Sequence, residues 1–184
     1  MILTPQIIAA GTGAAPSRAA IFAPFMRVAC EHYGISEPLD IAAFLAQTGH
    51  ESGHLVFTKE IWGPTVAQRA YEPPSAKATE LGNTQPGDGR RFCGRGLIQI
   101  TGRANYALAA GELDLDLLNH PELLEQPEHA AMSAAWFWWS KNLTPLALAG
   151  NFVALTRRIN GGTNGLVDRQ ALYSAAKKAM GITQ

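Results

Sequence analysis

The sequence changes character at Gln47-Thr48-Gly49-His50-Glu51-Ser52-Gly53-His54, where a run of apolar residues gives way to glycines and polar side chains. Before this stretch, Ile41, Phe44 and Leu45 repeat at the three- and four-residue spacing of one helix face. This spacing predicts a helix over residues 38–52, and Gly53 favours its end there. Glu51 is therefore expected at the C-terminal end of a helix, where the macrodipole disfavours a negative charge by about 0.3–1 kcal/mol.

The same helical spacing of apolar residues recurs along most of the chain. It predicts further helices over residues 16–33, 127–141, 152–159 and 166–180. Residues 61–96 differ, because they are rich in proline and glycine and predict long loops with little regular structure. Loops of that length are usually functional or mobile. We therefore expect a mainly α fold, with a single domain over residues 1–184 and an irregular, loop-rich central lobe.

The composition is that of an ordinary globular protein. Hydrophobic residues make up 47% and charged residues 16% of the 184 residues, and the formal net charge is zero. These values exclude a disordered chain and a strongly electrostatic nucleic-acid binder. Cys30 and Cys93 stand too far apart for a metal-type pair, so a cysteine-rich zinc site is excluded. We expect two buried thiols rather than a disulfide.

The N-terminal residues Met1-Ile2-Leu3-Thr4-Pro5-Gln6 lack the basic start and the long apolar run of a signal peptide. No uncharged apolar run is long enough to cross a bilayer. We therefore expect the chain to be made in the cytoplasm, so that a substrate outside the cell would require another factor to let the protein through. Lys177-Lys178 on the last predicted helix is a weak indication of contact with an anionic membrane.

Two glutamates and a glycine-rich block indicate a chemistry. Glu60 follows Glu51 by nine positions, past a predicted turn, so the two carboxylates are expected to face each other across a groove. The block Phe92-Cys93-Gly94-Arg95-Gly96-Leu97-Ile98-Gln99-Ile100-Thr101-Gly102-Arg103-Ala104-Asn105-Tyr106 supplies hydroxyl and amide groups suited to a water and a sugar. A carboxylic acid and a carboxylate are the two groups needed to hydrolyse a glycosidic bond.

The aromatic residues divide into two groups. Trp62, Tyr71 and Tyr106 lie in or beside the loop region, and they are the aromatic residues expected to contact a sugar. A second group, Trp136-Phe137-Trp138-Trp139, lies on a predicted helix. Its spacing predicts that Trp136 and Trp139 face the core while Trp138 points elsewhere.

His50-Glu51-Ser52-Gly53-His54 also matches the H-E-x-x-H pattern of zinc proteases, in which two histidines on one helical face hold the metal. That pattern needs an unbroken helical turn, and Gly49 and Gly53 each weaken a helix by about 1 kcal/mol relative to alanine. It also needs a third ligand, and the extended motif would require histidine at the position of Glu60. We therefore expect no metal and no cofactor, and a zinc peptidase or amidase is the alternative from another class.

Segments spread along nearly the whole chain resemble glycoside hydrolase family 19. They are residues 49–53, Glu60, residues 92–102, Asn105-Tyr106, residues 159–162 and Asp168-Arg169. The likeness is nearest to the bacteriophage and prophage endolysins, which are relatives of plant class I and II chitinases, and residues 62–72 also look like that branch. The resemblance implies a lysozyme-like, α-rich fold. His54 is a departure, since many relatives have a small residue there.

The resemblance also implies roles for individual residues. Glu51 corresponds to the general acid, Glu60 to the general base, and Thr101 to the hydroxyl residue that helps hold the nucleophilic water. Arg169 corresponds to a charged partner that orients a catalytic carboxylate. Three side-chain amides correspond to sugar contacts, namely Gln99, Asn105 and Asn160. The family inverts anomeric configuration, which requires room for a water between the carboxyl groups.

The resemblance thus predicts an endolysin-type glycosidase that hydrolyses β-1,4 bonds of peptidoglycan, in the backbone of N-acetylmuramic acid and N-acetylglucosamine. We expect a monomer that acts on the cell wall in the periplasm after release from the cytoplasm, with no nucleic-acid partner. A chitinase acting on chitin oligomers is the nearest alternative, because both polymers contain β-1,4-linked N-acetylhexosamines. A catalytically silent wall-binding protein is disfavoured, since both glutamates are present.

Overall fold

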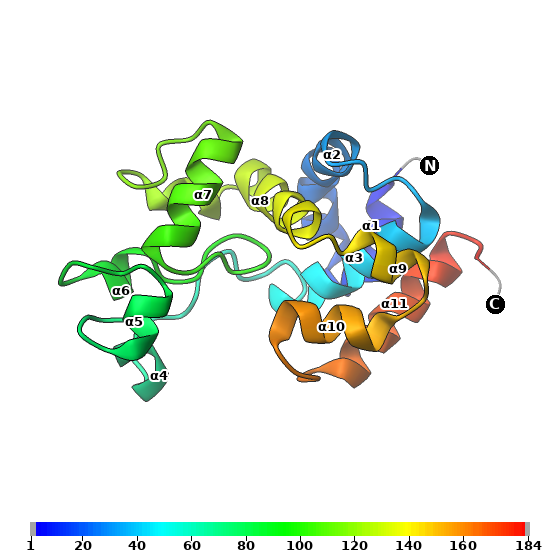
Figure 1. Cartoon of the computed structure of the whole chain (residues 1–184). Coiled ribbons are helices and arrows are strands. Elements are labelled where there is room, and N and C mark those ends of the chain that lie inside the picture. The colour runs from blue at the N-terminus through cyan, green and yellow to red at the C-terminus, as the bar shows by residue number, and fades with distance from the viewer. Residues whose placement is uncertain (1–2, 183–184) are drawn as a thin grey trace.

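The computed structural model describes residues 3–182 and is built from helices (Figure 1). These are α1 (Pro5–Thr12), α2 (Pro16–His32), α3 (Pro38–Glu51), α4 (Val66–Arg69), α5 (Ala76–Glu80), α6 (Asp88–Arg91), α7 (Arg103–Leu113), the 3-10 helix η1 (Pro121–Glu125), α8 (Pro127–Ser140), α9 (Thr144–Leu148), α10 (Phe152–Asn160) and α11 (Leu166–Ala179). Within residues 3–182 the only β pairings are two isolated bridges that Arg95 makes with Lys59 and with Ile100. The predicted mainly α fold is confirmed.

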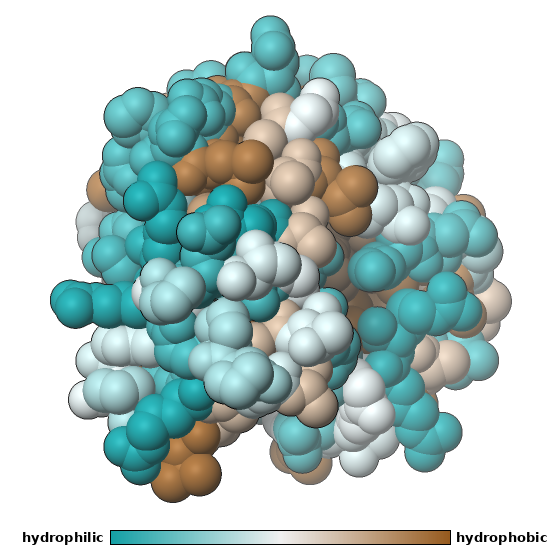
Figure 2. Space-filling view, turned by 60° about the vertical axis from the view of Figure 1, so that its left-hand side comes forward, coloured by the Kyte–Doolittle hydropathy of each residue, from teal (hydrophilic) through white to brown (hydrophobic). Residues whose placement is uncertain are grey.

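The helices gather in two groups (Figure 1). The helical lobe consists of α1 to α3 and α8 to α11, with α3 packed against α1, α9 and α11. The loop lobe consists of residues 58–113, with the short helices α4 to α6 and the longer α7. Helix α8 contacts both α2 and α7, so it joins the lobes. On the face shown in Figure 2, hydrophobic side chains gather in the upper part of a mostly hydrophilic surface.

Helix α3 forms the centre of the helical lobe because small residues let α1 approach it closely. A Cβ at Gly49 would lie 2.5 Å from the Cα of Thr12, and one at Gly11 would lie 2.8 Å from the Cβ of Leu45. Phe44 and Leu45 are fully buried. The end of α3, and with it Glu51, is therefore fixed against the rest of the lobe.

The aromatic run of α8 is arranged differently from the prediction. Trp138 is fully buried, donates from Nε1 to Asp40 Oδ1 over 2.9 Å, and packs edge-on against Phe44. Trp139, predicted to face the core, is 57% exposed, whereas Trp136 is buried as predicted. The prediction failed because the core-facing stripe of α8 is alanine-rich: it consists of Ala131, Ala134, Ala135 and Trp138.

The structure also tests the predictions for the loop region and the cysteines. Residues 61–96 are mostly loop, but three short helices lie within them, and α1 and α7 were also not predicted. Cys30 and Cys93 are both buried and unpaired with each other, as expected. Burial raises the pKa of each thiol and so keeps it protonated. No helix in the described part of the chain has the length and apolar character needed to cross a membrane.

Candidate active site

Glu51 is the last residue of α3 and lies against α11. The guanidinium of Arg169, on α11, donates from Nη2 to Glu51 Oε1 and from Nη1 to Gln47 Oε1. The side chain of Arg169 is 1% exposed and that of Glu51 is 20% exposed. Within residues 3–182, Glu51 Oε2 accepts no hydrogen bond. One oxygen of this carboxyl group is thus fixed by a buried cation, and the other is available to a ligand.

A buried network holds this guanidinium in turn. Gln47 Nε2 donates to Thr156 Oγ1 over 2.9 Å, and the Thr156 hydroxyl donates to the Phe152 carbonyl over 2.9 Å. Arg169 Nε donates to the carbonyl of Asn164 over 3.1 Å. A buried charge is tolerated when its hydrogen-bonding groups are paired in this way. The network joins α3, α10 and α11, and it positions the predicted general acid.

The two histidines of the H-E-x-x-H motif do not share a helix face. Helix α3 ends at Glu51, and His54 lies beyond it with a φ of 64°. His50 Nδ1 lies 2.6 Å from Asp168 Oδ2, while His54 Nδ1 lies 2.8 Å from the carbonyl oxygen of Thr12. The end of the helix therefore removes the geometry on which the zinc alternative depends. His50 instead ties the end of α3 to the start of α11.

Glu60 belongs to the loop lobe and is held by uncharged donors. Gln68 Nε2 donates to Oε1 over 2.9 Å, and the backbone N–H of Gly94 donates to Oε2 over 3.0 Å. The N–H of Glu60 donates to the Gly94 carbonyl over 2.8 Å. Gln68 is itself fixed by a capping box with Thr65 at the start of α4. A folded loop, rather than a cation, thus orients this carboxylate.

Gly94 also brings Glu60 next to the polar residues of the glycine-rich block. A Cβ at position 94 would lie 2.6 Å from Gln99 Oε1 and 3.3 Å from Thr101 Oγ1. Only glycine allows the backbone to approach the Gln99 side chain so closely. The predicted base, the predicted hydroxyl and one predicted sugar-contacting amide therefore meet around one peptide unit.

The hydroxyl of Thr101 is already oriented within its loop. Oγ1 donates to the Gln99 carbonyl over 2.9 Å, and Asn105 Nδ2 donates to the Thr101 carbonyl over 2.7 Å. A hydroxyl carries one proton and two lone pairs. Because the proton is used inside the loop, Thr101 presents acceptor lone pairs to a ligand.

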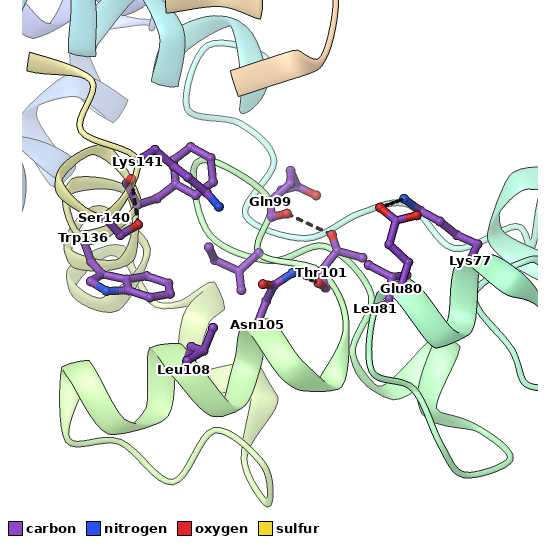
Figure 3. Close-up of a pocket in the computed structure, with 12 residues that line it drawn as sticks. Lys77, Glu80, Leu81, Gln99, Thr101, Asn105, Leu108, Trp136, Ser140 and Lys141 are labelled. Atoms are coloured by element: carbon purple, nitrogen blue, oxygen red, sulfur yellow. Dashed lines mark hydrogen bonds and ion pairs between the residues drawn. The ribbon is translucent and has the colours of Figure 1, made fainter. Parts of the chain in front are cut away.

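A cavity of about 480 Å³ opens beside Thr101, between the loop lobe and α8 (Figure 3). Its lining combines polar and aromatic residues, among them Gln99, Thr101, Asn105, Trp136, Phe137 and Lys141. Apolar walls with a few convergent polar groups are typical of small-ligand sites. Glu51 and Glu60 are not part of its lining. The cavity is therefore an arm of the site beside the reacting groups and does not enclose them.

The three aromatic candidates have separate positions. Trp62 and Tyr71 are half-buried neighbours with ring centroids 6.3 Å apart. Burial and, after it, the charge of Glu60 raise the pKa of Tyr71, which places this pair on the Glu60 side. Tyr106 is fully buried, so the prediction that it contacts a sugar is wrong. Its hydroxyl donates to the Cys93 carbonyl over 2.7 Å and accepts from Arg95 Nη1 over 3.0 Å, which supports the glycine-rich block from behind.

Asn160 ends α10 and has an unusual feature. Within the described residues, its Oδ1 atom is buried and has no hydrogen-bond partner. A buried acceptor without a donor is costly, by about 1–3 kcal/mol. Because this oxygen is shielded from the surface, the sugar contact expected of Asn160 stays a prediction.

Two supporting glutamines, Gln47 and Gln68, were not among the predicted site residues, although the sequence carried a signal for each. Thr65 and Gln68 have the three-residue spacing of a capping box. Gln47 precedes Glu51 by four positions and so shares its helix face. Neither spacing reveals what the amide binds, because the partners lie elsewhere in the chain.

Comparisons with known proteins show the family of the chain. A family model described as chitinase class I, of glycoside hydrolase family 19, matches residues 19–153. A glycosyl hydrolase family 19 domain-containing protein of Haemophilus influenzae is 37% identical over 169 residues, covering 79% of this chain and 82% of that protein. Endochitinase At2g43610 of Arabidopsis thaliana is 41% identical over 123 residues, covering 67% of this chain. The chain spans only 40% of the length of that plant relative.

Solved structures show the same fold. Chitinase C from Streptomyces griseus HUT6037 superposes with a TM-score of 0.75 at 23% identity, covering 99% of this chain and 78% of that one. A bacterial family 19 chitinase superposes with a TM-score of 0.73, also at 23% identity, covering 100% of this chain and 97% of that one. The match to the family model and the match to the Haemophilus influenzae protein lead to one conclusion. This chain belongs to glycoside hydrolase family 19.

Proposed function

We propose that this protein hydrolyses β-1,4 bonds in the glycan backbone of peptidoglycan, with inversion of configuration. The observation that carries the proposal is the meeting of Glu60, Gln99 and Thr101 around Gly94. Glu51 stands on the other lobe, held by Arg169. Two carboxyl groups supplied from opposite lobes, one of them beside a hydroxyl, match the requirements of hydrolysis by direct attack of water.

Glu51 acts as the general acid. Arg169 occupies Oε1, so the proton is carried on Oε2, which accepts no hydrogen bond from residues 3–182. This proton passes to the glycosidic oxygen as the bond to the anomeric carbon breaks. The fixed guanidinium stabilises the carboxylate that is left behind, because an opposite charge lies against it.

Glu60 acts as the general base, and Thr101 helps to place the water. The attacking water directs one proton to the Glu60 carboxylate and the other to the acceptor lone pairs of Thr101. Its own lone pair is then free to form the new bond to the anomeric carbon. Glu60 takes up the proton that the water loses, and exchange of protons with solvent then returns Glu60 to the carboxylate and Glu51 to the acid for the next turnover.

Peptidoglycan is the proposed polymer because the segment from Trp62 to Glu72 looks like the endolysin branch of the family. Chitin is the second candidate, because several relatives are named endochitinases. We also propose that the protein acts as a monomer on the wall in the periplasm, after release from the cytoplasm.

Mass spectrometry of digested polymers tests the proposal. Purified sacculi and N-acetylglucosamine hexamer are incubated separately with the protein. We expect the sacculi to release muropeptides joined to short glycans with new reducing ends. Release of peptides without new reducing ends would indicate a peptidase, and cleavage of the hexamer alone would indicate a chitinase. Either result would contradict the proposal.

A further inference from the structure

Lys141 reaches into the cavity from the end of α8. It is the C-cap of that helix and part of the cavity lining. Its Nζ atom lies 5.8 Å from the centroid of the Phe137 ring, so the aromatic face steadies the side chain. Figure 3 shows the side chain extended toward Gln99, across from Thr101. The cation is therefore aimed at the polar side of the cavity.

The positive charge at this end of the cavity is not balanced. The other lysine of the lining, Lys77, is paired with Glu80 over 3.0 Å and adds no net charge. Within residues 3–182, Lys141 forms no ion pair. Arg158 donates from Nη1 to the Lys141 carbonyl over 3.3 Å and likewise has no acidic partner among the described residues. Among the described lining residues, Lys141 is thus the cation without an acidic partner.

An unpaired cation in a ligand site indicates a negatively charged group on the ligand. Chitin is neutral along its length and offers none. Peptidoglycan carries carboxylates on its stem peptides, and on the lactyl group of muramic acid where no peptide is attached. A charge-assisted hydrogen bond to such a carboxylate is stronger than one to a neutral sugar hydroxyl.

We infer that Lys141 binds a carboxylate of the peptidoglycan strand and so makes the enzyme favour this polymer over chitin. The inference rests on the proposed function, since it concerns the same cavity. It assigns Lys141 to substrate selection and gives it no part in bond cleavage. Its loss therefore acts mainly on KM.

The test compares Lys141→Met with Lys177→Met. Methionine keeps an unbranched chain against the Phe137 ring but removes the charge. Lys177 is a matched control, because its Nζ lies 4.9 Å from the Tyr173 ring on α11, outside the cavity lining. The substrates are soluble peptidoglycan strands and the same strands with their carboxylates converted to methylamides. We expect Lys141→Met to lower kcat/KM about tenfold on the natural strands, through KM, and less than about twofold on the amidated strands.

Several outcomes overturn the inference. An equal loss on both substrates would show that Lys141 contacts neutral groups, and unchanged kinetics on natural strands would remove its role altogether. In both cases wild-type cleavage of peptidoglycan would leave the proposed function intact. A wild-type protein that cleaves only chitin would overturn both proposals. Strands freed of stem peptides distinguish the two carboxylates, because the effect of Lys141→Met persists there only if the lactyl group is bound.

Discussion

The two carboxylates of the site are held in opposite ways by the two lobes. Glu51 lies at a helix end and contacts a buried guanidinium that comes from α11, 118 residues further along the chain. Glu60 lies in a loop and accepts hydrogen bonds from the Gln68 amide and the Gly94 backbone, 8 and 34 residues away. The helical lobe thus supplies charge, and the loop lobe supplies neutral dipoles.

This difference suits the two proposed tasks. A general acid becomes negative when it releases its proton, so a fixed cation beside it stabilises the product of that step. A general base is already negative and needs orientation toward the water, which neutral donors provide without pairing it to a cation. The same residue type therefore serves two roles because its surroundings differ.

The largest expected effect comes from removing either carboxyl group. Glu51→Gln and Glu60→Gln should each lower kcat by about 10²–10⁴-fold, the range typical of general acid–base groups. Glu60→Gln should be the milder change if solvent partly replaces the base. Turnover is measured on peptidoglycan strands, with Glu128→Gln as an exposed control on α8. Near-wild-type turnover in either folded variant would exclude the corresponding role.

The next largest effect distinguishes the charged support of Glu51 from the neutral support of Glu60. Arg169→Met should lower the free energy of unfolding by about 3–5 kcal/mol, because it leaves Glu51 and Gln47 without their buried donor. Gln68→Met should cost about 1–3 kcal/mol, because it removes neutral hydrogen bonds only. Urea unfolding measures both values. Equal losses would show that the two lobes hold their carboxylates alike.

A smaller effect is expected at Thr101. Thr101→Val keeps the shape but removes the acceptor, so it should lower kcat by about 10–100-fold with little change in KM. Thr101→Ser should be mild, since it retains the hydroxyl. Steady-state kinetics on the three proteins provide the test. A rise in KM with kcat unchanged would assign Thr101 to sugar binding.

The smallest effect concerns acid stability, where one aspartate in each lobe behaves oppositely. The Arg103 guanidinium, 2.5 Å away, lowers the pKa of Asp88 below its ordinary value of 3.8. Asp88 therefore stabilises the fold above pH 3.8, and this contribution is lost as the pH falls through the lowered pKa. Burial raises the pKa of Asp40 above 3.8, so its ionisation costs stability as the pH rises from that value.

Unfolding by urea across the acid range tests this contrast. Asp88→Asn should reduce the loss of unfolding free energy as the pH falls below 3.8. Asp40→Asn should reduce the loss of unfolding free energy as the pH rises above 3.8. Variants that alter the same part of the pH curve would contradict the opposite shifts.

The helical lobe was the easier half to predict. Long amphipathic helices carry their own periodicity, so α2, α3, α8, α10 and α11 were expected to within about two residues. Helix α7 was missed because its start lies within the glycine-rich block, and its alanines and exposed Leu108 give no clear apolar stripe. Helices α4 to α6 are too short for periodicity, and only their capping residues mark them.

The site was predictable in its residue types and in the pairing of Arg169 with a catalytic carboxylate, but not in its other contacts. Motif resemblance placed Glu51, Glu60, Thr101 and Arg169, and the structure brings Arg169 to Glu51 and Thr101 to Gly94. Tyr106 was wrongly predicted to contact a sugar. Its hydroxyl is buried because it pairs with Arg95 and the Cys93 carbonyl, and the local sequence does not reveal these partners. Contacts across many residues depend on how the lobes pack, which local spacing does not encode.

The stereochemistry of the first product tests the central claim most directly. If Glu60 and Thr101 deliver a water directly to the anomeric carbon, no glycosyl-enzyme intermediate forms and the configuration inverts. Rapid NMR during digestion of β-1,4-linked strands should then show the α-anomer first, before mutarotation produces the β-anomer. A first product in the β configuration would mean retention, and it would contradict both the water-placing role of Thr101 and the assignment of Glu60 as base.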